Sequence, residues 1–140
     1  MRAPIWLYRA RLGVLLGNRL LMLEHTGRTS GQRRFTVLEV IGHPSRDVYI
    51  VASGFGTRAQ WFRNVEANPN VSVSVASRTS VPATARNLCP AEAGTALRAY
   101  TERHPTAWEA MKPAIESTLG AEIDTADTAL PMVELTLRNA

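Results

Sequence analysis

A glycine-bracketed basic turn near the start of the chain limits how the segments on either side of it can pair. The stretch 27–34 reads Gly-Arg-Thr-Ser-Gly-Gln-Arg-Arg and joins an apolar run at 20–23 to another at 35–41. Glycines let a backbone turn tightly and expose its N–H groups. Exposed N–H groups and arginine side chains together bind phosphate or carboxylate through charge-assisted hydrogen bonds. The stretch therefore predicts a hairpin whose loop binds an anion, and a solvated basic loop is the alternative interpretation.

Six segments of the sequence have the pattern of β-strands. Val71, Val73 and Val75 alternate with small residues, which is typical of a half-buried strand. Turn residues at 43–47 and 77–80 separate neighbouring segments, so consecutive strands are expected to pair antiparallel. The expected strands are 19–25, 34–41, 48–53, 71–76, 81–86 and 132–137. Short strands of this kind favour closure into a small barrel, because closure removes unpaired sheet edges.

Helical patterns occur before, between and after these strands. The expected helices are 5–17, 58–67, 91–103 and 106–119. Pro113 should kink or break the last of them, and the segment 121–129 reads as an acidic loop. Residues 1–140 are expected to form one mainly β (α+β) domain, a six-stranded antiparallel barrel with N-terminal, inserted and late helices.

The charge balance narrows the class of partner. The net charge is +4, and Lys112 is the only lysine, so nearly all the positive charge comes from arginine. This balance is compatible with nucleic acid, an acidic lipid surface or an anionic cofactor as partner. The basic residues are scattered and no strand is rich in aromatic residues, which argues against nucleic acid.

The cysteine and histidine content argues against several kinds of site. Cys89 is the single cysteine, so no internal disulfide and no thiolate metal cluster is expected, which fits a reducing cytoplasm. His25, His43 and His104 have no metal-ligand spacing, so no metal site is expected. No apolar stretch reaches the roughly 20 residues that a membrane-spanning helix needs. We expect a cytoplasmic protein, with contact between the segment 1–17 and a membrane surface as the alternative.

The sequence lacks the motifs of an enzyme whose own side chains carry the chemistry. It contains no Walker loop, dinucleotide fingerprint, His-Glu metal motif or nucleophile elbow. Carboxylates are sparse before Glu92 and form no evident acid–base pair. A hydrolase or a metalloenzyme is therefore disfavoured. An enzyme whose cofactor carries the chemistry needs only binding, orientation and electrostatics from the protein, which matches a chain with two glycine-rich turns.

Three motifs in this order resemble the deazaflavin-dependent nitroreductase family of actinobacterial oxidoreductases. They are Glu24-His25-Thr26-Gly27-Arg28-Thr29-Ser30-Gly31-Gln32-Arg33-Arg34, then Val51-Ala52-Ser53-Gly54-Phe55-Gly56, then Gln60-Trp61-Phe62-Arg63-Asn64-Val65 with Ala67-Asn68-Pro69. The resemblance extends over residues 20–105. It implies a split β-barrel that uses coenzyme F420, a deazaflavin, as its cofactor.

The resemblance also implies which residues bind this cofactor. The phosphate and the acidic tail would lie on Arg28, Thr29, Ser30 and Arg34. The deazaflavin ring would lie against Thr36, Val37, Leu38, Ala52, Ser53 and Gly54. A helix that carries Gln60, Trp61 and Asn64 would cover the ring. For Trp61, the alternative is a core aromatic side chain that anchors this helix.

The implied reaction is hydride transfer from the C5 carbon of the reduced deazaflavin to an electron-poor acceptor. The protein must hold the two reactants about 3–3.5 Å apart and stabilise the developing negative charge. Ser53, backbone N–H groups and Tyr100 are the candidates for this stabilisation. Some family members place several tyrosines near the substrate, whereas this chain offers only Tyr100 and Trp108 there, so nitroreductase activity itself is not assumed.

Two positions depart from the better-known members of that family. Thr29 and Gly54 stand where lysines are common, and each lost cation should weaken tail binding by about 1 kcal/mol. Arg33 and Arg58 are the candidates to compensate for these losses.

Three functional hypotheses remain open at this point. The first is an F420-dependent oxidoreductase that acts on a small hydrophobic acceptor. The second keeps the barrel and replaces the cofactor with FMN, which also carries an anionic phosphate. The third is a non-enzymatic protein that binds a lipid or a cofactor. A homodimer is expected by analogy with other split barrels.

Overall fold

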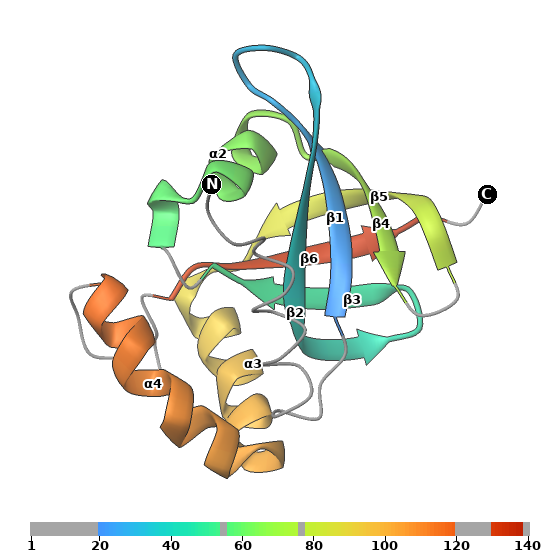
Figure 1. Cartoon of the computed structure of the whole chain (residues 1–140). Helices are drawn as coiled ribbons and strands as arrows, with labels where there is room; N and C mark the ends of the chain where they lie inside the picture. The colour runs from blue at the N-terminus through green and yellow to red at the C-terminus, as the bar shows by residue number, and fades with distance from the viewer. Residues whose placement is uncertain (1–19, 54–55, 76–77, 120–129, 139–140) are drawn as a thin grey trace.

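The computed structural model describes residues 20–53, 56–75, 78–119 and 130–138, and its strands close into a barrel (Figure 1). The six strands are β1 (Leu20–Thr26), β2 (Arg33–Ser45), β3 (Val48–Ala52), β4 (Asn70–Val75), β5 (Arg78–Asn87) and β6 (Met132–Leu137). Around the barrel their order is β1-β2-β3-β6-β5-β4, and every neighbouring pair is antiparallel. The predicted six-stranded antiparallel barrel is therefore confirmed.

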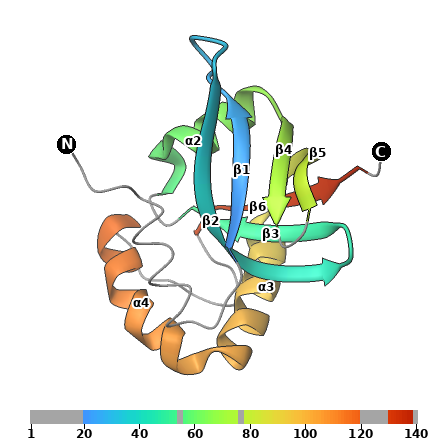
Figure 2. The ribbon, with the colours of Figure 1, turned by 45° about the vertical axis from the view of Figure 1, so that its right-hand side comes forward.

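Helices cover the two ends of this barrel. The helix α2 (Gln60–Ala67) follows the short 3-10 turn η1 (Gly56–Arg58) and precedes β4, whereas α3 (Pro90–Arg103) and α4 (Pro105–Leu119) lie between β5 and β6 in the chain. Figures 1 and 2 show α2 beside the loop that joins β1 to β2, and α3 with α4 at the opposite end. The inserted and late helices are thus confirmed. The expected helix 5–17 and the expected loop 121–129 lie outside the described residues.

Successive side chains of β1 and β2 point to opposite sides, so this hairpin has a face toward the barrel interior and an outer face. Leu21 pairs with Leu38, and nearer the loop His25 pairs with Arg34. Directly opposed residues point to the same face of a sheet, and the face repeats every second residue. His25 and Arg34 therefore share the inner face with the buried leucines, whereas the side chain of Phe35 lies on the outer face and is 55% exposed.

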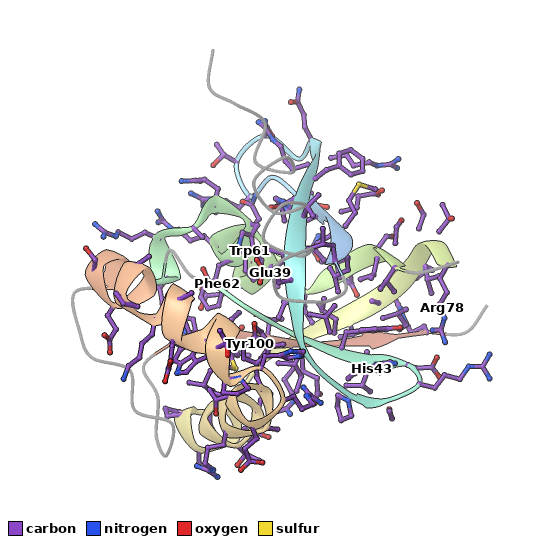
Figure 3. All side chains as sticks on the ribbon, turned by 60° about the horizontal axis from the view of Figure 1, so that its bottom comes forward. Glu39, His43, Trp61, Phe62, Arg78 and Tyr100 are labelled. Atoms are coloured by element: carbon purple, nitrogen blue, oxygen red, sulfur yellow. The ribbon has the colours of Figure 1, made fainter. Side chains whose placement is uncertain are left out.

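Apolar side chains form two separate clusters. The larger one fills the barrel and includes Trp61, Phe62 and Val65 of α2, so this helix is anchored to the barrel. The smaller one contains Tyr100 of α3 and Trp108 of α4. Figure 3 shows Trp61 and Phe62 close together at α2 and Tyr100 at the α3–α4 end.

Several predicted boundaries are wrong, and each error has a local cause. The strand β5 begins at Arg78 rather than after a turn at 77–80, because Ser80 takes a positive φ of 48° where the pairing with β4 shifts. The strand β2 runs on to Ser45 through two register shifts in its pairing with β3.

The helix α4 is not broken at Pro113. Pro113 is exposed, so water can bond the carbonyl group that its ring leaves without an N–H donor.

Two findings within the described residues bear on the function classes. No helix there has both the length and the apolar character that crossing a bilayer requires. No group of three or more His, Cys, Asp or Glu side chains there is arranged to hold a metal ion.

Candidate functional site

The glycine-bracketed turn between β1 and β2 closes on itself through backbone hydrogen bonds. The Gly27 N–H donates to the Gln32 carbonyl at 2.8 Å, and the Gly31 N–H donates to the Gly27 carbonyl at 2.8 Å. Gly31 has a φ of 70°, which favours glycine, and a Cβ at Gly27 would lie 2.7 Å from Ser30 Oγ, so the Ser30 side chain would have to move. The residues between the two glycines are exposed, so the tip of the turn faces solvent.

Arg28 reaches from this turn to α2. Its backbone N–H donates to Asn64 Oδ1 at 3.1 Å, its Nη1 donates to the same oxygen at 2.7 Å, and its Nη2 donates to Gln60 Oε1 at 2.9 Å. Both acceptors are neutral amide oxygens, so they orient the guanidinium without neutralising its charge. Within the part of the chain that the structure describes, its remaining N–H groups have no further hydrogen-bond partner, so they can bind an anion. The turn and α2 thus present an oriented positive charge.

A buried histidine contacts Asn64 from the barrel side. His25 and Asn64 are both 5% exposed, and Asn64 Nδ2 lies 3.1 Å from His25 Nδ1. Burial and the positive charge of Arg34 lower the pKa of His25. The neutral form of the His25 ring is therefore favoured near pH 7.

Two further arginines follow the turn on opposite faces of β2. Arg33 Nε lies 3.1 Å from Glu24 Oε2, so its charge is partly compensated, and this reduces its value as a substitute for a missing lysine. Arg34 is exposed, and its Nε would lie 3.7 Å from a Cβ at Gly27, so its side chain lies along the turn. The residues predicted to bind an anionic tail, Arg28, Thr29, Ser30 and Arg34, are thus all exposed at or beside the turn.

The residues predicted to line a cofactor ring lie partly at the surface and partly in the core. Thr36, Val37 and Ala52 are half-buried. Leu38 is 1% exposed and belongs to the barrel core. Gly54 lies outside the described residues.

Trp61 lies on the core side of α2. It is 8% exposed and belongs to the cluster that fills the barrel. Its ring meets that of Phe62 edge-on, with centroids 5.8 Å apart and an interplanar angle of 85°. This packing gives Trp61 the anchoring position that the alternative interpretation expects.

The two predicted catalytic residues are buried. Ser53 is 1% exposed, and its backbone N–H donates to the Pro131 carbonyl at 2.9 Å. Tyr100 is also 1% exposed, and its ring centroid lies 5.2 Å from that of His104. The structure therefore places neither side chain on the exposed surface beside the turn.

Sequence reasoning did not find the contact of His25 with Asn64. The sequence contains one signal, because His25 continues the alternation of Leu21 and Leu23 and is the only polar member of that inward series. A polar side chain at a buried strand position needs a hydrogen-bond partner. Asn64 supplies it from a position 39 residues further along the chain.

Three solved structures share the fold of this chain. A protein described as F420-H2 dependent reductase FDR-A has 22% identity and a TM-score of 0.58, and the match covers 83% of this chain and 92% of that one. A protein described as F420 reductase has 17% identity, a TM-score of 0.53 and coverage of 91% and 93%. A third, described as a domain-swapped dimer, has 20% identity, a TM-score of 0.55 and coverage of 94% and 97%.

The family assignment comes from the sequence. Among curated proteins no match was found. A family model described as F420H(2)-dependent quinone reductase matches residues 1–121, which is most of the chain. The chain therefore belongs to the F420H(2)-dependent quinone reductase family.

Proposed function

We propose that this chain uses reduced coenzyme F420 to reduce a small, hydrophobic and electron-poor acceptor, such as a quinone, an enone or a nitro compound. Its family makes it an F420-dependent reductase with coenzyme F420 as cofactor, so the FMN alternative is not needed. A quinone has the most support among these acceptors, because the matching family is described as a quinone reductase.

The observation that carries the proposal is the oriented charge of Arg28. Its guanidinium is held by two neutral amide oxygens, from Gln60 and Asn64, at the tip of an exposed glycine turn. An anionic tail with phosphate and carboxylate groups fits such a site, because it supplies the acceptors that the remaining N–H groups need. Arg34 adds a second positive charge beside the turn. We assign the tail of the cofactor to Arg28, Thr29, Ser30 and Arg34.

The strand β2 offers a route from this tail site to a ring site. Arg34 and Thr36 point to the same face of β2 and are separated by about 7 Å along the strand. We assign the ring to the half-buried Thr36, Val37 and Ala52, with Val37 contacting it through its backbone because its side chain points to the other face of β2, and Gly54 stays a prediction outside the described residues. Gln60 and Asn64 of α2 contact Arg28 and so lie beside the proposed tail site, and their predicted cover of the ring stays part of the proposal.

The chemistry divides between the cofactor and the chain. When bound, the reduced cofactor supplies the hydride. The chain binds the tail through its arginines, and the rigid barrel holds the ring site in a fixed position relative to the turn. We assign the stabilisation of negative charge on the acceptor to backbone N–H groups, Ser53 or Tyr100. Both side chains are 1% exposed, so either role requires a movement that uncovers the hydroxyl group.

A fluorescence titration of coenzyme F420 with the purified protein tests this proposal. Binding in the micromolar range that weakens as salt is raised is expected, because the tail contacts are exposed charge pairs. FMN serves as competitor and should displace the cofactor poorly. Protein that binds neither compound would contradict the proposal. A screen of quinones, enones and nitro compounds with the reduced cofactor then identifies the acceptor class.

We infer a homodimer as the assembly to test. The supporting observation is that one protein of the same fold is described as a domain-swapped dimer. Light scattering on a size-exclusion column measures the mass directly, and a value near 15.4 kDa would contradict the inference. Membrane contact through the segment 1–17 stays a prediction, because that segment lies outside the described residues.

A further inference from the structure

We propose that His25 is a positioning residue that, through Asn64, holds the Arg28 guanidinium in the orientation that binds the anionic tail of the cofactor. This inference rests on the proposed function, because it concerns the tail site of that same cofactor. It adds a buried residue that the family resemblance did not bring to this site. Three contacts carry it: two join Arg28 of the turn to Asn64, and one joins Asn64 to His25 of the barrel.

The two contacts with Arg28 fix which way the Asn64 amide faces. The Arg28 backbone N–H and the Arg28 Nη1 group both lie within hydrogen-bond distance of the same Asn64 atom, at 3.1 and 2.7 Å. Both are donors and neither can accept a hydrogen bond. The atom that faces them must therefore be the carbonyl oxygen Oδ1, and the amide nitrogen Nδ2 must face the barrel.

The third contact fixes the tautomer of His25. Asn64 Nδ2 lies 3.1 Å from His25 Nδ1, and an amide nitrogen can only donate. His25 Nδ1 must therefore accept, which places the ring proton on Nε2. A proton on Nδ1 would set two donors against each other. The amide would then have to turn over, and Arg28 would face an NH₂ group in place of an oxygen.

The charged groups around His25 support the neutral ring. Arg34 of β2 is paired with His25 on the inner face of the hairpin, and Arg28 reaches the other side of Asn64. From α2, the charged side chains of Arg63 and Glu66 are exposed, and from β1 the neighbouring Glu24 is paired with Arg33. Burial is the main reason that the pKa of His25 is lowered, and the positive charge of Arg34 adds to it.

The contact with a neutral amide also leaves the positive charge of Arg28 uncompensated. A carboxylate at position 64 would also hold the guanidinium, but it would neutralise the charge that an anionic ligand needs. The Asn64 amide holds the guanidinium without neutralising it. The amide must, however, be fixed with its oxygen and not its nitrogen facing Arg28. His25 does this, because Nδ1 offers an acceptor for Nδ2 on the barrel side.

Affinity for F420 in four variants tests the proposal. His25→Leu removes the acceptor at similar volume and should weaken binding roughly fivefold, whereas His25→Asn keeps an acceptor near the position of Nδ1 and should stay within about twofold. Asn64→Asp keeps the contact with Arg28 and adds a negative charge, so it should weaken binding about tenfold or more. Arg46→Ala removes one exposed charge from the turn between β2 and β3, at the other end of β2, and serves as the matched control.

A double-mutant cycle separates positioning from a merely structural role. When Arg28 is already alanine, His25→Leu should cause no further loss of affinity, because His25 acts through Arg28. A structural role would lower the affinity by the same factor in both backgrounds. Long-range ¹H–¹⁵N spectra of the ligand-free wild-type protein should show the Nε2–H tautomer of His25, and thermal unfolding verifies that each variant is folded.

The binding measurements distinguish an error in the role of His25 from an error in the proposed function. If wild-type protein does not bind F420, the proposed function is wrong and the positioning role falls with it. If the wild type binds and folded His25→Leu binds equally well, the positioning role is wrong and the proposed function stands. An Nδ1–H tautomer in the ligand-free protein would also overturn the positioning role.

Discussion

Arg28 Nη1 lies 2.7 Å from Oδ1 of Asn64, a residue 36 positions further along the chain. This contact joins the exposed turn between β1 and β2 to a helix that is itself anchored in the barrel core. An exposed arginine on a free loop samples many rotamers, and binding must then order it at an entropic cost. The contacts with Asn64 and Gln60 already order the Arg28 side chain, so the proposed anion site is preorganised.

Replacing Arg34 should weaken the binding of the cofactor. Arg34 is exposed beside the turn, and its side chain lies near Gly27. Arg34→Ala removes a charge-assisted contact to the tail, so F420 affinity should fall about tenfold or more, and the loss should shrink as salt is raised. Fluorescence titration at two salt concentrations measures both effects, with Arg46→Ala as control. Unchanged affinity in Arg34→Ala would remove Arg34 from the site.

The turn should tolerate no side chain at Gly31. Its φ of 70° is left-handed, so Gly31→Ala should lower the free energy of unfolding by about 1 kcal/mol. Gly42→Ala is the matched control, because a Cβ there would make an ordinary contact of 3.5 Å with Ile50 and the residue has no left-handed φ. Urea unfolding of the two variants measures the difference. Equal losses would show that the conformation at Gly31 is not what the substitution disturbs.

The burial of His25 should make stability depend on pH. The unfolded chain takes up a proton on His25 near pH 6.5, whereas the folded chain does so only at a lower pH, because burial and Arg34 lower its pKa. Between these two values protons bind preferentially to the unfolded chain, so the free energy of unfolding falls as the pH is lowered. Above about pH 6.5 both states are neutral and this contribution is constant. Urea unfolding from pH 5 to 8 measures the slope, and His25→Asn should have a smaller one.

The two interpretations of Trp61 can be separated by two substitutions. Trp61→Ala should lower the free energy of unfolding by about 3 kcal/mol or more, because the side chain is buried in the barrel cluster. Trp61→Phe keeps an aromatic ring in the core, and its F420 affinity should stay within about threefold of the wild type. A folded Trp61→Phe protein that has lost F420 binding would show that the indole itself contacts the cofactor.

The barrel could be predicted from the sequence because apolar and polar residues alternate along its strands. Val71, Val73 and Val75 alternate as predicted, and they form the inward series of β4. The start of β5 was missed because a positive φ at Ser80 lets a strand continue where its residues suggest a turn. Of the kink or break predicted at Pro113, the break does not occur, because the exposed position lets water bond the carbonyl group that proline leaves without a donor, and exposure is not stated by the sequence.

The candidate site was predictable in its position and not in its internal contacts. The glycines and arginines at 27–34 are enough to propose an anion site there, because their backbone and charge properties are local. The contacts of Arg28 with Gln60 and Asn64 depend on how α2 folds back onto the hairpin, and no local pattern specifies that. The contact of His25 with Asn64 was missed for the same reason, since this partner is brought to it only by the closed barrel.

The separation of the two apolar clusters limits how far the effect of a substitution spreads. The cluster that anchors α2 also fills the barrel, whereas Tyr100 and Trp108 belong to the second cluster with α3 and α4. Substitutions at additive, weakly coupled positions accumulate independently of one another. Substitutions around Tyr100 and Trp108 should therefore leave the packing of α2, and with it the contacts of Arg28, largely unchanged.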